Sequence, residues 1–127
     1  MANVPENLHY SKDHEWVGVD GDTATIGITD YAQKQLGDVV YIDLPDVGRT
    51  VSQGEALGTI ESVKAVSEIF APVSGEVVEV NAALKDSPET VNSDPHGAWM
   101  VAIRLADPAE TAALLDSTQY ADLVKNE

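Results

Sequence analysis

The sequence predicts a mainly β protein of the barrel or sandwich type with a few short helices. Short runs rich in Val, Ile and Thr alternate with turn residues along most of the 127-residue chain. Asp20-Gly21 separates two such runs, which is a strong signal for a hairpin. Since 43% of the residues are hydrophobic, the chain has enough apolar side chains for one core, and we expect a single domain over residues 1–127.

The expected strands follow from alternating apolar residues bounded by Gly, Pro, Asp and Ser. They cover residues 8–10, 15–19, 23–28, 39–44, 50–51, 56–61, 68–71 and 99–105. We expect the core to draw on apolar residues from several of these strands and from the strand that follows Gly75, namely Val40, Ile42, Ile60, Val77 and Ile103.

Helix signals occur at two places. Thr29 can cap a short helix over residues 30–36, which Gly37 would end. Near the C-terminus, Asp107, Pro108 and Glu110 stand in capping-box order, and a second helix can restart at Ser117. We expect these C-terminal helices to pack on the β domain.

The chain is strongly acidic. It has 22 Asp and Glu against 7 Lys and Arg, a formal net charge of -15. Nucleic-acid phosphates and anionic membranes would repel such a chain, so we expect neither as a partner, whereas basic partners could be attracted. No apolar run has the length of a membrane span, and Met1–Glu6 lacks the features of a signal peptide, which predicts a cytoplasmic protein.

The sequence argues against several kinds of catalysis. There is no Cys, no Gly-x-Ser-x-Gly elbow and no phosphate-binding Gly-rich loop. His9, His14 and His96 show no metal-ligand spacing. We therefore expect neither a catalytic residue nor a metal site, and any sulfur redox chemistry would need an imported sulfur.

Lys64 stands out by its position. The expected strands 56–61 and 68–71 leave Ser62-Val63-Lys64-Ala65-Val66-Ser67 at the tip of a hairpin, where a side chain projects into solvent. It is a rare cation in an acidic chain and is flanked by small or β-branched residues. By topology alone an ordinary solvated lysine is the more common explanation.

The residues around Lys64 favour a special role. Segments 61–69 and 71–77 resemble the modification hairpin of lipoyl-carrier domains, and the version Glu-Ser-Val-Lys-Ala resembles that of the glycine cleavage H protein family. The resemblance extends to further motifs, which lie in segments 14–16, 26–32, 36–40 and 92–100 and in the C-terminal helices. Two positions depart from the family pattern: His96 stands where Tyr is usual and Ala102 where Lys is common.

This resemblance implies a fold and a function. The fold would be a lipoyl/biotinyl-carrier-type barrel-sandwich hybrid, and Lys64, rather than Lys34 or Lys85, would be the sole site of covalent lipoate attachment. The protein would be a non-catalytic carrier that takes an aminomethyl group from the glycine decarboxylase (P protein) to the aminomethyltransferase (T protein). It would pass electrons to dihydrolipoyl dehydrogenase (L protein), and lipoyl-attaching enzymes would modify it.

The resemblance also implies a surface cleft that shelters the loaded arm. Glu15 and Glu68 would hold the aminomethyl ammonium there by charge-assisted hydrogen bonds, although each could equally be an exposed strand carboxylate. Three alternatives stay open: a biotin carrier, which usually has Met where Val63 and Ala65 stand, a cofactor-free interaction domain, and a donor of lipoyl groups to other enzymes.

Overall fold

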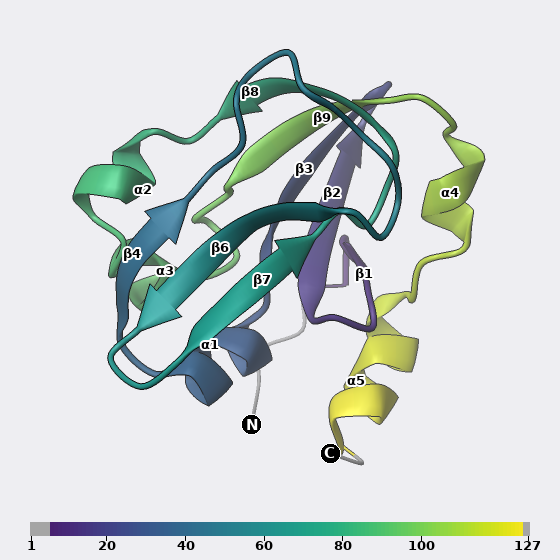
Figure 1. Cartoon of the computed structure of the whole chain (residues 1–127). Coiled ribbons are helices and arrows are strands. Elements are labelled where there is room, and N and C mark those ends of the chain that lie inside the picture. The colour runs from purple at the N-terminus through teal and green to yellow at the C-terminus, as the bar shows by residue number, and fades with distance from the viewer. Residues whose placement is uncertain (1–5, 126–127) are drawn as a thin grey trace.

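The computed structural model describes residues 6–125, so most of the Met1–Glu6 stretch lies outside the described residues. It contains a six-stranded antiparallel sheet in the order β1-β2-β3-β9-β8-β5 and a three-stranded antiparallel sheet in the order β4-β6-β7. The strands are β1 His9–Tyr10, β2 Glu15–Asp20, β3 Thr23–Ile28, β4 Val39–Asp43, β5 Thr50–Val51, β6 Ala56–Ser62, β7 Val66–Phe70, β8 Gly75–Val80 and β9 Val101–Leu105. The β6–β7 hairpin lies across the six-stranded sheet (Figure 1).

The helices are short and lie around the sheets (Figure 1). They are α1 Asp30–Leu36, α2 Ala83–Asp86, α3 Thr90–Ser93, α4 Ala109–Ala112 and α5 Ser117–Lys125. The mainly β fold with a short internal helix and C-terminal helices is confirmed. No helix among residues 6–125 is long and apolar enough to cross a membrane.

Helix α1 occupies the predicted residues because its end signals are local. The Thr29 hydroxyl oxygen accepts a hydrogen bond from Ala32 N at 3.1 Å and so caps the first turn. Gly37 follows with φ +81°, a left-handed conformation that favours glycine, and its N–H binds the Gln33 carbonyl. The capping-box expectation at Glu110 is not met: its carboxylate accepts hydrogen bonds from Ser74 N and Oγ instead.

The main core lies between the two sheets. It includes four of the five predicted residues, Ile42, Ile60, Val77 and Ile103, all buried. The prediction was wrong for Val40, which is 51% exposed. Val39 pairs with Ser62 and Tyr41 with Glu61, so Val40 is the extra residue of a β-bulge. The bulge breaks the alternation and leaves Val39, rather than Val40, facing the core.

A second apolar cluster joins the C-terminal helix to the first strands. Tyr10, Trp16 and Tyr120 are buried together, with Leu115 and Val124 packed against them. Tyr10 and Leu115 exchange both backbone N–H to O hydrogen bonds at 2.8 Å. The region after α4 thereby acts as an extension of the β1 edge, and the predicted packing of the C-terminal helices on the β domain is confirmed.

Candidate functional site: a lysine hairpin beside a cleft

Lys64 lies exposed at the turn between β6 and β7, as the sequence predicted. The Ser62 side chain builds this turn: its oxygen lies 3.0 Å from Ala65 N and 3.3 Å from Lys64 N. Ser62 N also donates to the Ala65 carbonyl at 2.8 Å. The turn is shorter than predicted because Val66 and Ser67 already belong to β7.

The hairpin tip is docked on the corner between α1 and β4. Val63 N donates to the Asp38 carbonyl at 3.0 Å, and the Lys64 stem passes over Gly37 so closely that a Cβ there would lie 3.4 Å from Lys64 Cε. Asn92 on α3 holds this corner together. Its side-chain amide donates a hydrogen bond to Gly37 O and accepts one from Val39 N, both at 2.8 Å. Lys64 therefore lies on a turn that is docked on the rest of the fold.

The other two lysines considered as attachment sites have different surroundings. Lys34 lies in α1 and forms an ion pair with Asp30 at 3.1 Å. Lys85 is exposed in the short helix α2. Both lysines lie in helices, whereas Lys64 lies at the turn between two paired strands.

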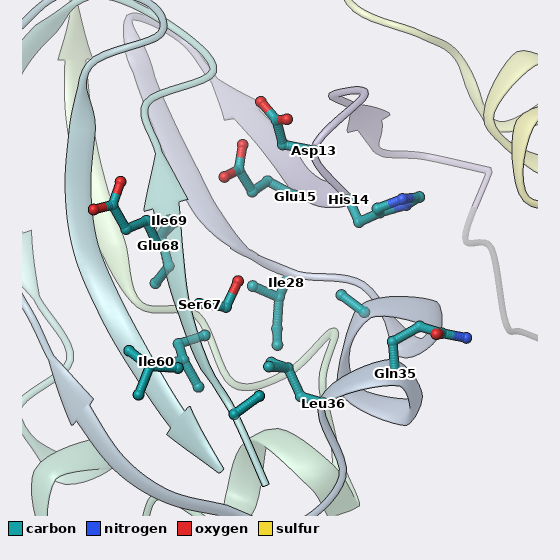
Figure 2. Close-up of a pocket in the computed structure, with 13 residues that line it drawn as sticks. Asp13, His14, Glu15, Ile28, Gln35, Leu36, Ile60, Ser67, Glu68 and Ile69 are labelled. Carbon is teal, nitrogen blue, oxygen red and sulfur yellow. The ribbon is translucent and has the colours of Figure 1, made fainter.

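A cleft of about 330 Å³ opens next to the hairpin, between β7 on one side and β2 and α1 on the other. Figure 2 shows Ile28, Leu36 and Ile60 gathered in it, with the Glu15 and Glu68 side chains on two different strands. Ala65 and Val66 line the end near Lys64. From Val66 the cleft follows β7 as far as Ile69, about 10 Å at roughly 3.3 Å per residue.

Glu15 and Glu68 differ in their burial. Glu15 is only 2% exposed: Oε1 accepts a hydrogen bond from Ser11 Oγ at 2.9 Å and Oε2 accepts one from Phe70 N at 2.7 Å. Burial raises the pKa of Glu15 to about 8, although both hydrogen bonds oppose the shift. Glu68 is exposed on β7. The reading of Glu15 as an exposed strand carboxylate is therefore excluded, while both residues line one cleft.

Further residues of the cleft carried no clear signal in the sequence. Asp13 and Ser67 line it, and the sequence indicated no chemical role for either side chain. His14 lines it too; the sequence placed it in the family-like segment 14–16 and weighed it as a metal ligand, but gave it no role in a cleft. No three His, Asp or Glu residues among residues 6–125 are grouped to hold a metal ion. His96 lies outside the cleft, and burial lowers the pKa of its imidazole.

Two antiparallel sheets, with a solvent-exposed lysine at the turn of one hairpin, define a lipoyl/biotinyl-carrier-type barrel-sandwich hybrid. The family model described as "Glycine cleavage H-protein" matches residues 8–127. The chain belongs to the glycine cleavage H protein family, the lipoyl carriers of the glycine cleavage system. The resemblance inferred from Glu-Ser-Val-Lys-Ala is thereby confirmed.

Individual relatives agree with this assignment. The chain is 60% identical to the glycine cleavage system H protein of Enterobacter sp. (strain 638), with all of both chains covered. It is 54% identical to that of Brevibacillus brevis over 95% of this chain and 97% of the relative. A crystal structure of the H protein from Mycobacterium marinum superposes with a TM-score of 0.88 at 40% identity, covering 96% of this chain and 99% of that one.

Proposed function

We propose that Lys64 carries a covalent lipoyl group and that the protein uses it as the aminomethyl and electron carrier between the P, T and L proteins. The observation that supports this most strongly is the Glu-Ser-Val-Lys-Ala turn itself, with its lysine exposed on a supported hairpin beside a cleft. When attached, lipoate supplies the dithiolane redox chemistry that the Cys-free chain lacks.

The chain's own residues supply the turn that carries the arm and the cleft that would shelter it. The Ser62 hydroxyl and the Asp38 carbonyl fix the turn, so the Lys64 amine projects toward a modifying enzyme. The apolar floor of the cleft, Ile28, Leu36 and Ile60, suits the methylene part of an arm, while Glu15 and Glu68 supply carboxylates for a cationic cargo. None of these residues needs to act on a bond, which fits a non-catalytic carrier.

The attachment site can be tested by intact mass and peptide mapping. Unmodified protein is incubated with a lipoate-attaching ligase, lipoate and ATP. We expect one lipoyl addition on wild type and on Lys34→Arg and Lys85→Arg, and none on Lys64→Arg. Because Lys64 is exposed, Lys64→Arg should change the free energy of unfolding by less than about 0.5 kcal/mol.

Carrier function is then measured as glycine-dependent NADH formation with purified P, T and L proteins and tetrahydrofolate. Lipoylated wild type should support it and the Lys64→Arg variant should not. Lipoate mapped to another lysine, or full activity of Lys64→Arg, would overturn the proposal. A mass increase matching biotin in protein purified from its natural host would favour the biotin-carrier alternative.

A further inference from the structure

The Tyr120 hydroxyl joins two parts of the cleft wall without lining the cleft itself. Tyr120 lies in α5 and is fully buried. Its oxygen is 2.6 Å from Thr29 Oγ1 and 2.9 Å from His14 Nδ1. Thr29 caps α1, which contributes Ala32, Gln35 and Leu36 to the cleft, and His14 lines the cleft directly. One hydroxyl therefore links the start of α1 to the loop before β2.

His14 needs support because of its backbone conformation. Among residues 6–125 it is the one non-glycine residue with a positive φ, +67°, a region that a side chain with a Cβ disfavours. Its ring contacts the Tyr31 ring, with centroids 4.7 Å apart, and forms a T-shaped pair with the Tyr120 ring, with centroids 5.7 Å apart. His14 lies between Asp13 and Glu15 in the chain, and both of these acidic residues also line the cleft.

The Tyr120 ring is held in place by packing that does not involve its hydroxyl. Its ring stacks on the buried Tyr10 ring with centroids 4.5 Å apart and an angle of 9° between the planes. The pair of backbone hydrogen bonds between Tyr10 and Leu115 ties the segment just before α5 to β1. The variant Tyr120→Phe can keep this stack, because only the oxygen is lost.

We propose that Tyr120 is a positioning residue for the cleft: its hydroxyl holds His14 and Thr29 in the arrangement that retains the aminomethyl cargo. The proposal rests on the proposed function, since it assumes that the loaded arm occupies this cleft. It assigns a role in carrier function to the C-terminal helix, which otherwise acts as a cover for the second apolar cluster.

The first test uses the unmodified protein, so it does not depend on lipoate. Nitrogen-15 NMR of the His14 imidazole and amide hydrogen exchange at Ala32 are compared between wild type and Tyr120→Phe. We expect a shift of the His14 Nδ1 resonance and faster exchange at Ala32. The matched control is Tyr41→Phe, since Tyr41 is 49% exposed on β4 and does not line the cleft. Unchanged signals in Tyr120→Phe would overturn the proposal.

The second test measures release of formaldehyde and ammonia from lipoylated protein loaded with the aminomethyl group. Tyr120→Phe should release the cargo about threefold to tenfold faster, the range expected for one lost hydrogen bond. Val77→Ala, a core change outside the cleft, should leave the rate unchanged even if it lowers the melting temperature more. If the release rate of both variants increased in proportion to their loss of melting temperature, the positioning role of Tyr120 would be contradicted.

A double-mutant comparison isolates the route through His14. Glycine adopts a positive φ without strain, so His14→Gly keeps the backbone and removes the ring. The effects of His14→Gly and Tyr120→Phe on release should be less than additive, because they break the same contact. Additive effects of the two substitutions would overturn the proposal that Tyr120 acts through His14. If wild type released its cargo as fast as urea-unfolded protein, the sheltering cleft of the proposed function would fail instead.

Discussion

Glu15 is the residue whose chemistry the fold changes most. Its carboxyl group is buried on β2, and it joins the two sheets by accepting a hydrogen bond from Phe70 N on the edge strand β7. The desolvation that raises its pKa to about 8 favours the protonated form near neutral pH. An ammonium group arriving in the cleft would favour the charged form instead, so cargo binding and Glu15 ionisation should be coupled.

Glu15 should make the protein less stable as the pH rises. Its pKa is about 8 in the folded chain against an ordinary 4.5, so the folded state binds the proton more tightly. Its contribution to the free energy of unfolding is then greatest below pH 4.5 and is lost as the pH rises toward 8, by on the order of a few kcal/mol.

The measurement is urea unfolding across this pH range for wild type and Glu15→Gln. The amide keeps the size of the side chain but cannot ionise, so the difference between the variant and wild type should move in favour of the variant as the pH rises. A Glu61→Gln control, on the exposed part of β6, should follow wild type. Parallel profiles for wild type and Glu15→Gln would show that Glu15 does not titrate in this range.

The two cleft carboxylates should slow the loss of the aminomethyl group. A shielded carboxylate holding an ammonium contributes about 1.5 to 3 kcal/mol, and an exposed one much less. Release of ammonia and formaldehyde from the loaded arm should therefore be about tenfold or more faster in Glu15→Gln and less affected in Glu68→Gln. Lipoylation should be normal in both, and equal release rates in wild type and both variants would mean that the protection arises elsewhere.

At the scale of elements, the important arrangement is the support of the β6–β7 hairpin by the corner between α1 and β4. Asn92 on α3 holds that corner through Gly37, Val39 and Gln33, and the corner in turn binds Val63. Helix α3 has only four residues, and it contributes this amide to the corner and the buried Val91 to the main core. The hairpin tip is thus held in place by elements that are not its neighbours in the sequence.

Asn92→Ala should weaken both the fold and the presentation of Lys64. Loss of the amide leaves Gly37 O and Val39 N without this partner, at a cost of about 1 to 3 kcal/mol in the free energy of unfolding. We also expect a higher KM for a lipoate-attaching ligase with little change in kcat, because the hairpin is less well ordered before it binds.

Asn81→Ala is the matched control. Asn81 donates through its side-chain amide to Trp99 O at 2.8 Å, outside the cleft and the hairpin corner. This variant should also lose stability while its lipoylation kinetics stay those of wild type. If KM rose equally in both variants, the effect of Asn92→Ala would come from a general loss of stability rather than from the hairpin corner.

At the scale of the whole molecule, the excess of acidic side chains should oppose folding. A net charge of -15 on 127 residues produces self-repulsion in the compact state. Ion pairs such as Lys34–Asp30 and Arg104–Glu76 are at the surface, where each contributes little. Repulsion between many like charges should therefore outweigh these attractions at low ionic strength.

Salt should consequently stabilise the protein. Raising NaCl from about 0.01 M to about 0.1 M shortens the screening length from roughly 30 Å to roughly 10 Å, so the melting temperature should rise by a few degrees. The control is the same titration near pH 4.2, the isoelectric point, where the net charge vanishes and the response should be small. A melting temperature that falls with salt at neutral pH would mean that attractive pairs dominate.

Several features follow from the sequence alone because their causes are local. Thr29 and Gly37 bound α1 at the predicted residues, and the Asp-Gly turn joins β2 to β3. The Lys64 turn is set by neighbours within a few residues, above all Ser62, and the Glu-Ser-Val-Lys-Ala motif indicated the family. In each case the deciding hydrogen bond or backbone conformation involves residues close together along the chain.

Other features were decided only by tertiary structure. The bulge exposes Val40, the carboxylate of Glu110 binds Ser74 rather than capping a helix, and α2 and α3 are too short to show a helical period. The cleft requires Glu15, Glu68 and α1 to meet across different elements, and Tyr120 reaches His14 from the far end of the chain. Burial and cross-element contacts set these properties, and both depend on how the sheets and helices pack, which a local sequence pattern does not contain.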